Sequence, residues 1–505
     1  MAAQSPKPSS LGIRMYQVGF GDCFVLTFSY PTALADGRDV RHVLIDFGST
    51  RPAGRSDLVP IAEAIRAQTG GMIDVVVVSH RHKDHLSGFG TKEGPLLGMQ
   101  AGFPKLVVRS WTEHPELDRA ARGPDHRAAM AAAGPMSADV RRKSAQFVAS
   151  LRSAEQFAVR LAAKVDKPAA NSLPAELKQL VEDQISNKAA VDQLAAWAEA
   201  GKGAYLNYGS PSGIEDVVPG ITVRVLGPPT VNQHPAVAKQ KSRDPNEFWM
   251  VYAGVLGNLT KQDLLLRDVD PDDPGSPLPT GAAEADEALP AAGPSVALPA
   301  AIDDAPAATP VRGAQPTPGP VKWLTDRLGR QQVNSLLRIV RILDDVLNNT
   351  SVVLLIDVPA AGGEPVRLLF GGDAQIENWE YALKVVDGHE ENLDLLRKVD
   401  VYKVGHHGSR NATPRTLFNL WSEPGTKQRP MMALLSTKFG VHGKTEATKV
   451  PRKTLVAALD TRMTEPNFYQ TVRLPKGVLW AEITADLTKG KAFTNTTPSP
   501  PRPSR

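Results

Sequence analysis

The densest group of metal-ligating side chains lies at residues 79–85, where the sequence is SHRHKDH. Three histidines and one aspartate supply the imidazole and carboxylate ligands that divalent metals prefer. The i, i+2 spacing of His80 and His82 puts both imidazoles on one side of an extended segment, and a turn at Asp84 and His85 directs those side chains towards a second ion. The segment therefore predicts a metal site, and a solvated histidine-rich loop is the less favoured interpretation.

Two later segments also place metal-ligating side chains directly after an apolar run. The sequence LLFGGDA at residues 368–374 presents Asp373, and VYKVGHHGS at residues 401–409 presents His406 and His407. Taken alone, a Gly-Asp step is more often a turn, and a His-His pair is as often on the surface as in a site. The loops at strand ends of an α/β fold converge, however. The three segments together therefore favour one site, in which Asp373 could bridge two metals.

An α/β fold has to position these segments. Residues 74–79 form a continuous apolar, β-branched run that is typical of a buried strand, and this strand leads directly into the histidine segment. Apolar residues at helical spacing predict a helix at 58–69. Further strands are expected within 11–30 and at 41–46, 105–110, 221–226, 351–358, 366–371, 400–404, 431–436 and 478–483, and further helices at 376–385, 391–397, 413–421 and 451–460.

Two stretches differ in composition from this α/β pattern. Residues 115–205 are rich in alanine, leucine, lysine, glutamate and glutamine, which predicts a helical block punctuated by Pro168 and Pro174. Residues 267–320 are rich in proline, alanine and aspartate and poor in aromatic residues, which predicts a disordered linker. A helix is expected to follow at 321–347. We interpret both stretches as insertions into one core.

The overall composition is that of a soluble globular protein. The chain has 505 residues, 42% hydrophobic and 22% charged residues, and a net charge of +4, so no basic field covers the whole molecule. Its one cysteine, Cys23, excludes an intramolecular disulfide and a thiolate zinc cluster. The polar segment 1–10 has no apolar core of a signal peptide, and the apolar runs are too short to span a bilayer. We expect a cytoplasmic protein with no membrane association.

The order of these segments resembles the metallo-β-lactamase superfamily. The resemblance consists of an early aspartate (Asp46, in IDFG), the His-x-His-x-Asp-His loop, a later bridging aspartate and a final histidine. It is closest to the subgroup that includes the metallo-hydrolase domain of bacterial DNA-uptake channel proteins. That subgroup is similar at VGFGD (18–22), NNTSVV (348–353), the Gly-Asp-Ala step and HHGS (406–409), and its late Gly-His is approximated by GVH at 440–442.

The resemblance implies a four-layer αββα sandwich with the site at one edge, between two sheets. It covers about 11–110, 218–229 and 346–487. The expected organisation is a first half of the core at 11–110, a mainly helical insertion at 111–217 that could cap the site, a core strand at 218–229, a second insertion at 230–345 containing the linker, a second half of the core at 346–487 and a disordered tail at 488–505.

The resemblance also implies a ligand set. One metal would be held by His80 and His82 and a second by Asp84 and His85, with Asp373 as the bridge. Either His406 or His407 would complete the second site, and Asp22 and Asp46 would orient ligating imidazoles. Many superfamily members supply a further histidine before the bridging aspartate. Here either Glu113 or His114 replaces it or the ligand is absent, and His442 either contacts substrate or is a loop residue.

The implied activity is that of a metallo-hydrolase with two divalent ions, zinc or manganese. Asp84 would orient a hydroxide or accept a proton, and Lys403, Arg410 or His442 would hold an anionic substrate. The first hypothesis is hydrolysis of a phosphodiester or another phosphate ester, nucleic acid included. The alternatives are a lactone, thioester or amide at the same site, or a non-catalytic metal-binding scaffold whose helical insertion binds a protein partner. Basic residues of that insertion are more simply a solvated helix face than a nucleic-acid surface.

Overall fold

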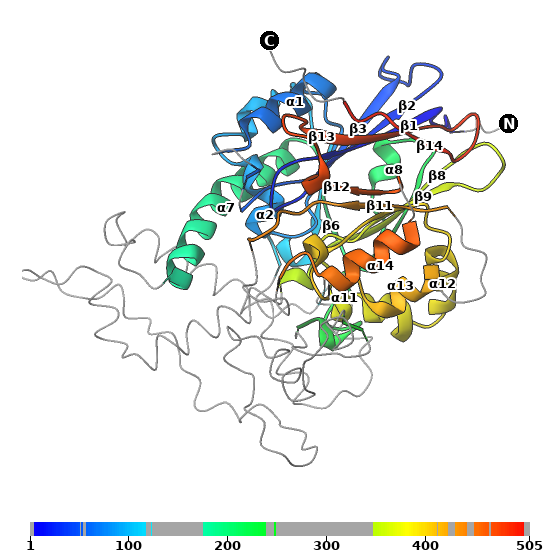
Figure 1. Cartoon of the computed structure of the whole chain (residues 1–505). Coiled ribbons are helices and arrows are strands. Elements are labelled where there is room, and N and C mark those ends of the chain that lie inside the picture. Colours follow the sequence, from blue (N-terminus) through cyan, green and yellow to red (C-terminus); the bar gives the residue numbers. More distant parts are fainter. Residues whose placement is uncertain are drawn as a thin grey trace, which may run out of the picture.

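The computed structural model describes residues 5–50, 52–53, 57–117, 123, 175–238, 247–248, 347–411, 413–422, 430–441, 449–463 and 466–498. The linker expected at 267–320 lies outside the described residues, as do residues 124–174 of the expected helical block and nearly all of the helix expected at 321–347. The described residues form a mixed α/β structure with two mixed sheets (Figure 1).

The first sheet has eight strands in the order β14-β13-β1-β2-β3-β4-β5-β6. Neighbouring strands from β14 to β3 are antiparallel, whereas β3, β4, β5 and β6 are parallel to one another. All three residues of β4 are buried valines, as expected for a strand that is covered on both faces. The strands are β1 (Ser10–Tyr16), β2 (Cys23–Ser29), β3 (Val40–Phe47), β4 (Val75–Val77), β5 (Leu106–Ser110), β6 (Gly203–Leu206), β13 (Trp480–Asp486) and β14 (Phe493–Asn495).

The second sheet has six strands in the order β12-β11-β10-β9-β8-β7. Strands β9 to β12 are parallel, and β7 and β8 continue the sheet in antiparallel fashion. Each parallel group therefore presents the carboxyl ends of its strands at one edge. The strands are β7 (Thr222–Gly227), β8 (Val353–Val358), β9 (Val366–Phe370), β10 (Val401–Lys403), β11 (Met432–Leu435) and β12 (Phe468–Gln470).

The two sheets share one hydrophobic core. Val43 and Val75 of the first sheet belong to the same buried cluster as Leu354 and Leu368 of the second. The rings of Phe24 and Phe370 meet edge to face across this core, with centroids 5.5 Å apart. Successive residues of a strand point to opposite faces, so the neighbouring positions on each strand have to be covered from the other side.

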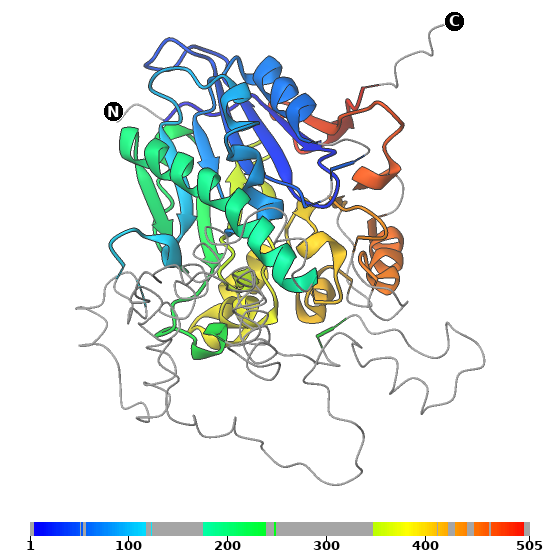
Figure 2. The same cartoon turned by 90° about the vertical axis from the view of Figure 1, so that its left-hand side faces the viewer.

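Helices provide that cover. α1 and α7 pack on the other face of the first sheet, where Ile61 and Leu194 join Leu44 and Val76 in one buried cluster, and Figure 2 shows α7 crossing this face. Helices α11 to α14 cover the second sheet. The helices are α1 (Val59–Thr69), α2 (Lys83–Leu86), α7 (Ala175–Ala200), α8 (Ile214–Val217), α11 (Ile376–Glu380), α12 (His389–Leu396), α13 (Arg415–Ser422) and α14 (Lys453–Met463). In the described part of the chain, no helix combines the length and apolarity needed to cross a membrane.

Three short strands differ from the expected pattern. β6 lies in the range expected to be helical and pairs in parallel with β5. β14 lies in the tail expected to be disordered and pairs with β13, where Asn495 is opposite Ile483. β12 was not expected at all. The helical expectation at 203–206 and the disordered one at 493–495 were wrong, because strands of three or four residues owe their conformation to the neighbouring strand rather than to a local pattern.

Candidate metal centre

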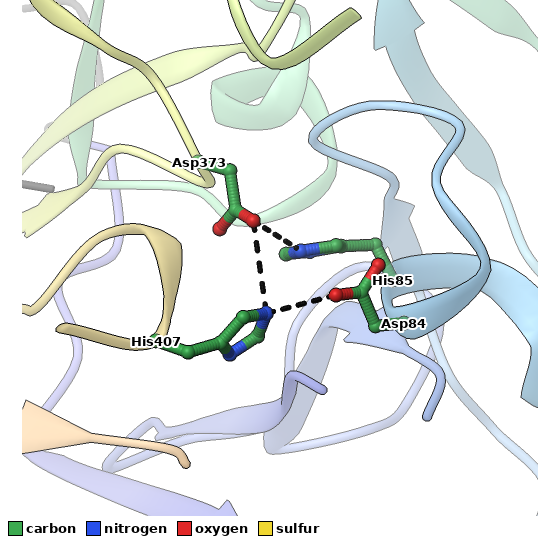
Figure 3. A group of neighbouring side chains, drawn as sticks. All are labelled: Asp84, His85, Asp373 and His407. Carbon is green, nitrogen blue, oxygen red and sulfur yellow. Dashed lines mark hydrogen bonds and ion pairs between the residues drawn. The ribbon is translucent and has the colours of Figure 1, made fainter. Parts of the chain in front are cut away.

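The carboxyl ends of strands from both sheets meet at one cluster of side chains. Asp84 and His85 follow β4, Asp373 follows β9, and His407 follows β10. One ligand atom from each of these four residues lies within 4.8 Å of the others (Figure 3). The structure thus brings together the three segments that were expected to form one site.

The carboxylates of this cluster face imidazole nitrogens. Asp373 Oδ2 lies 3.1 Å from Nε2 of His85 and 3.6 Å from Nε2 of His407. Asp84 Oδ2 lies 3.0 Å from the same His407 nitrogen. Figure 3 shows Asp373 pointing towards both imidazoles, with Asp84 beside His85 on the same segment. Two nitrogens and two carboxylates therefore converge on a small volume.

In His85 and His407, the outer nitrogen Nδ1, which faces away from the cluster, has a partner that fixes the ring. His85 Nδ1 lies 2.8 Å from Asp46 Oδ2, and His407 Nδ1 lies 3.1 Å from the carbonyl oxygen of Ser436. An oxygen acceptor at Nδ1 favours the tautomer that carries its proton there, which leaves the Nε2 lone pair towards the cluster. Asp46 is itself fixed, since it accepts hydrogen bonds from the amide and the hydroxyl of Ser79, at 2.7 and 2.8 Å.

Two glycines allow the chain to approach the histidine segment closely. A Cβ atom on Gly21 would lie 2.2 Å from the carbonyl oxygen of Gly48 and 2.7 Å from that of Asp84. A Cβ atom on Gly48 would lie 2.5 Å from the carbonyl oxygen of Lys83. The amide of Asp22 donates to the Asp84 carbonyl at 2.9 Å. The glycines of VGFGD and IDFG thus place the two early aspartates against the candidate centre.

Asp22 and Lys403 form a buried ion pair beneath the cluster. The Lys403 ammonium contacts the Asp22 carboxylate, donates to the carbonyl of Gly372 at 2.9 Å and lies 3.6 Å from Asp373 Oδ1. Burial acts to lower the pKa of Lys403, but Asp22 and Asp373 outweigh it and raise the pKa above its usual range. Lys403 is 2% exposed. The expectation that it holds an anionic substrate was wrong, because its charge is directed inwards at Asp22.

The charges of the cluster shift the pKa values of its members. Burial acts to raise the pKa values of Asp84 and Asp373, yet the neighbouring histidines hold both below their usual range. Burial acts to lower the pKa values of His85 and His407, yet the carboxylates, Asp373 foremost, raise both. The opposite shifts have one cause: positive charge next to the buried carboxylates stabilises their ionised form, and the carboxylates stabilise the protonated histidines.

The structure distinguishes between the two adjacent histidines. The imidazole of His407 is a member of the cluster and is fully buried. His406 instead contributes its backbone amide, which donates to Asp373 Oδ1 at 3.0 Å. Burial lowers the pKa of His406 to about 4, although Asp373 acts in the opposite direction. Positive φ angles of 40° at His406 and 50° at His407 produce this sharp turn.

His80 and His82 form a pair beside the cluster. Their nitrogens Nε2 and Nδ1 are 2.9 Å apart, and the His80 ring lies 4.2 Å from the His85 ring. Burial, together with His85 and His82, lowers the pKa of His80 well below its usual value. Within the described ranges, no group of three or more convergent ligand atoms includes either residue.

The expected substitutes for the missing ligand lie elsewhere. Glu113 accepts a hydrogen bond from Arg109 Nε at 3.0 Å. The His114 ring meets Tyr205 edge to face, with ring centroids 4.6 Å apart, and its Nδ1 accepts from the amide of Glu116. Neither residue joins a group of convergent ligand atoms in the described part of the chain, which favours the alternative that this ligand is absent.

Two further residues, His442 and Arg410, were expected to hold substrate, and two others contact His407 without having been expected to. His442 lies outside the described residues. Arg410 packs over the ring of Phe248, 5.6 Å from its centroid. Phe20 packs on His407 with centroids 4.3 Å apart, a contact that the sequence VGFGD could have suggested. The contact between His407 and the Ser436 carbonyl could not have been predicted from the sequence, because any residue supplies a backbone oxygen.

Comparisons with known proteins identify no relative. No family model, curated protein or solved structure matches this chain. The functional argument therefore depends on the residues and their geometry.

Proposed function

We propose that this chain is a metal-dependent hydrolase of the metallo-β-lactamase type, acting on a phosphodiester or another phosphate ester. The observation that carries the proposal is the convergence of Asp84, His85, Asp373 and His407 from strand ends of both sheets. The shared core between the sheets and the helices outside them support a four-layer αββα sandwich. The order of the ligand segments along the chain supports the same family.

The donor set fits a divalent metal ion. Two imidazole nitrogens and two carboxylates suit zinc or manganese, and His85, Asp373 and His407 are buried. Asp46 and the Ser436 carbonyl hold the outer nitrogens, as partners of metal-bound imidazoles do. In our proposal His80 and His82 would hold a second ion, to which Asp373 would also contribute. That ion would be held less firmly, because within the described residues neither His80 nor His82 belongs to a group of three convergent ligand atoms.

Asp84 is the member of the cluster that reaches solvent. Its side chain is 13% exposed, whereas those of His85 and His407 are fully buried and that of Asp373 is 2% exposed. Bound divalent ions would make hydroxide available near neutral pH and stabilise the negative charge that develops in the transition state. Asp84 is therefore the carboxylate placed to orient an attacking water molecule and to accept its proton.

Two alternatives predict different behaviour. Hydrolysis of a lactone, thioester or amide would use the same site, and only a substrate test separates it from phosphate ester hydrolysis. A non-catalytic scaffold would bind metal without turnover. The solvent-accessible carboxylate of Asp84 favours an enzyme over a scaffold, because water and substrate can reach this side of the cluster.

Hydrolysis of bis-p-nitrophenyl phosphate tests the proposal directly. We expect the full-length protein with zinc or manganese to release p-nitrophenol, and we expect His82→Ala and Asp373→Ala each to reduce kcat/KM. A lactone and a thioester assayed in parallel separate the alternative hydrolases. Absence of phosphodiester hydrolysis with every divalent ion tried, in protein that binds metal, would count against the proposal.

A matched pair of histidine variants tests the assignment of the ligand after β10. His407→Ala should remove bound metal, because its Nε2 lies in the cluster, whereas His406→Ala should retain it, because the contact of His406 with Asp373 is made by the backbone amide. Metal content after dialysis, measured by elemental analysis, gives the result. Loss of metal in His406→Ala with retention in His407→Ala would reverse the assignment.

A further inference from the structure

An open groove lies beside two residues, Phe20 and Ser436, that contact His407 of the candidate centre. It has a volume of about 590 Å³ and is lined chiefly by Gly19, Thr437, Lys438, Phe439, Thr471 and Lys476; we call it the Phe439 groove. Its volume is within the range of small-molecule sites and well above what a single phosphate ion fills.

The groove is connected to the centre through two pairs of adjacent residues. Thr437 follows Ser436, whose carbonyl lies 3.1 Å from His407 Nδ1. Gly19 precedes Phe20, whose ring packs on the same imidazole. The groove therefore borders two residues that contact the His407 imidazole.

The floor of the groove is held by hydrogen bonds. The amide of Thr437 donates to Thr471 Oγ1 at 2.9 Å, and this hydroxyl donates to the Thr437 carbonyl at 2.9 Å. Gln17 Nε2 donates to the carbonyl of Thr471 at 3.0 Å. A site fixed in this way does not have to order its backbone when a ligand binds.

The side chains above this floor combine positive charge with an aromatic ring. Lys438 and Lys476 are the charged residues among the described lining, which includes no carboxylate. Lys438 Nζ donates to the carbonyl of Pro52 at 2.9 Å, and Pro52 precedes Ala53 of the groove lining. Phe439 is 65% exposed, the highest value of any large hydrophobic residue in the described structure. An exposed aromatic face beside lysines suits a planar base that carries a phosphate.

We propose that the Phe439 groove binds a nucleoside phosphate unit of the substrate, with the base on Phe439 and the phosphate against Lys438 and Lys476. The inference rests on the proposed function, since the groove would hold the unit next to the phosphodiester at the candidate centre. It narrows the substrate class from phosphate esters in general to nucleotide-containing diesters.

Calorimetric titration of the full-length protein tests this inference without turnover. The probes are thymidine 5′-monophosphate, thymidine and inorganic phosphate, each with EDTA present. We expect the nucleotide to bind about tenfold more tightly than phosphate, as one stacked base allows. Phe439→Ala should remove that advantage and leave phosphate binding unchanged, and Lys476→Ala should weaken both. Val385→Ala, a change at the other exposed large hydrophobic residue, is the matched control and should have no effect.

The outcomes separate this inference from the proposed function. Equal binding of nucleotide and phosphate, or unchanged nucleotide binding in Phe439→Ala, would overturn the inference even if bis-p-nitrophenyl phosphate is hydrolysed. Nucleotide binding that depends on Phe439 and Lys476 would support the groove assignment even if that diester is not hydrolysed, and the proposed function alone would then fail.

Discussion

Replacing Lys403 with methionine should lower the free energy of unfolding by about 3–5 kcal/mol, the usual cost of removing one partner from a buried ion pair. The Lys403 ammonium contacts the carboxylate of Asp22, which is fully buried. Burial raises the pKa of Asp22, and Lys403 is the largest influence that opposes it. Methionine fills a similar volume without the charge, so the loss reports on the charge rather than on a cavity. Urea denaturation of EDTA-treated protein gives the value.

Two controls make this result specific. The double variant Lys403→Met with Asp22→Asn removes both charges and should recover part of the lost stability. Lys188→Met breaks an ion pair with Asp192 in which both side chains are largely exposed, and it should leave the free energy of unfolding nearly unchanged. If Lys403→Met were as mild as Lys188→Met, Lys403 would not act as the internal counter-charge of the centre.

The fold was predictable where the local pattern is strong. The valines of β4 and the apolar run of β8 are buried strands, as their apolar composition indicates. The helix at 58–69 buries Ile61, Ala62 and Ile65 at the spacing seen in the sequence. The strands β6, β12 and β14 were not predictable in this way, because pairing with a neighbour determines them.

The candidate site was predictable as a set of residue types but not in its detailed contacts. Histidines and aspartates at three strand ends indicated where ligand atoms would meet, because parallel strands deliver their carboxyl ends to one edge. The choice between His406 and His407 depends on two successive positive φ angles, which residue type does not reveal. The inward direction of Lys403 did have a signal: the two-residue period of a strand puts it on the same face as Val401, in the core between the sheets.

Adding a divalent metal to the EDTA-treated protein should stabilise it, and the stabilisation should increase between pH 6 and pH 8. A metal that binds only the folded state contributes about 2.7 kcal/mol when its free concentration is 100 times Kd. Without metal, the carboxylates raise the pKa values of His85 and His407. A histidine with a raised folded-state pKa stabilises the fold fully below its unfolded pKa, and this contribution is lost as pH rises through the folded-state value. The metal-free protein should therefore lose stability across this range.

Metal binding reverses this trend, because an ion takes the place of the protons on His85 and His407. Each displaced proton makes the apparent affinity rise by about tenfold per pH unit below the folded-state pKa of the histidine. Thermal unfolding with and without manganese at pH 6, 7 and 8 measures the difference. His407→Ala should reduce both the metal-induced shift in Tm and its dependence on pH, whereas Lys188→Met should change neither. A shift in Tm that is the same at pH 6 and pH 8 would mean that the added metal does not bind through these imidazoles, and the candidate centre would then not be the metal site.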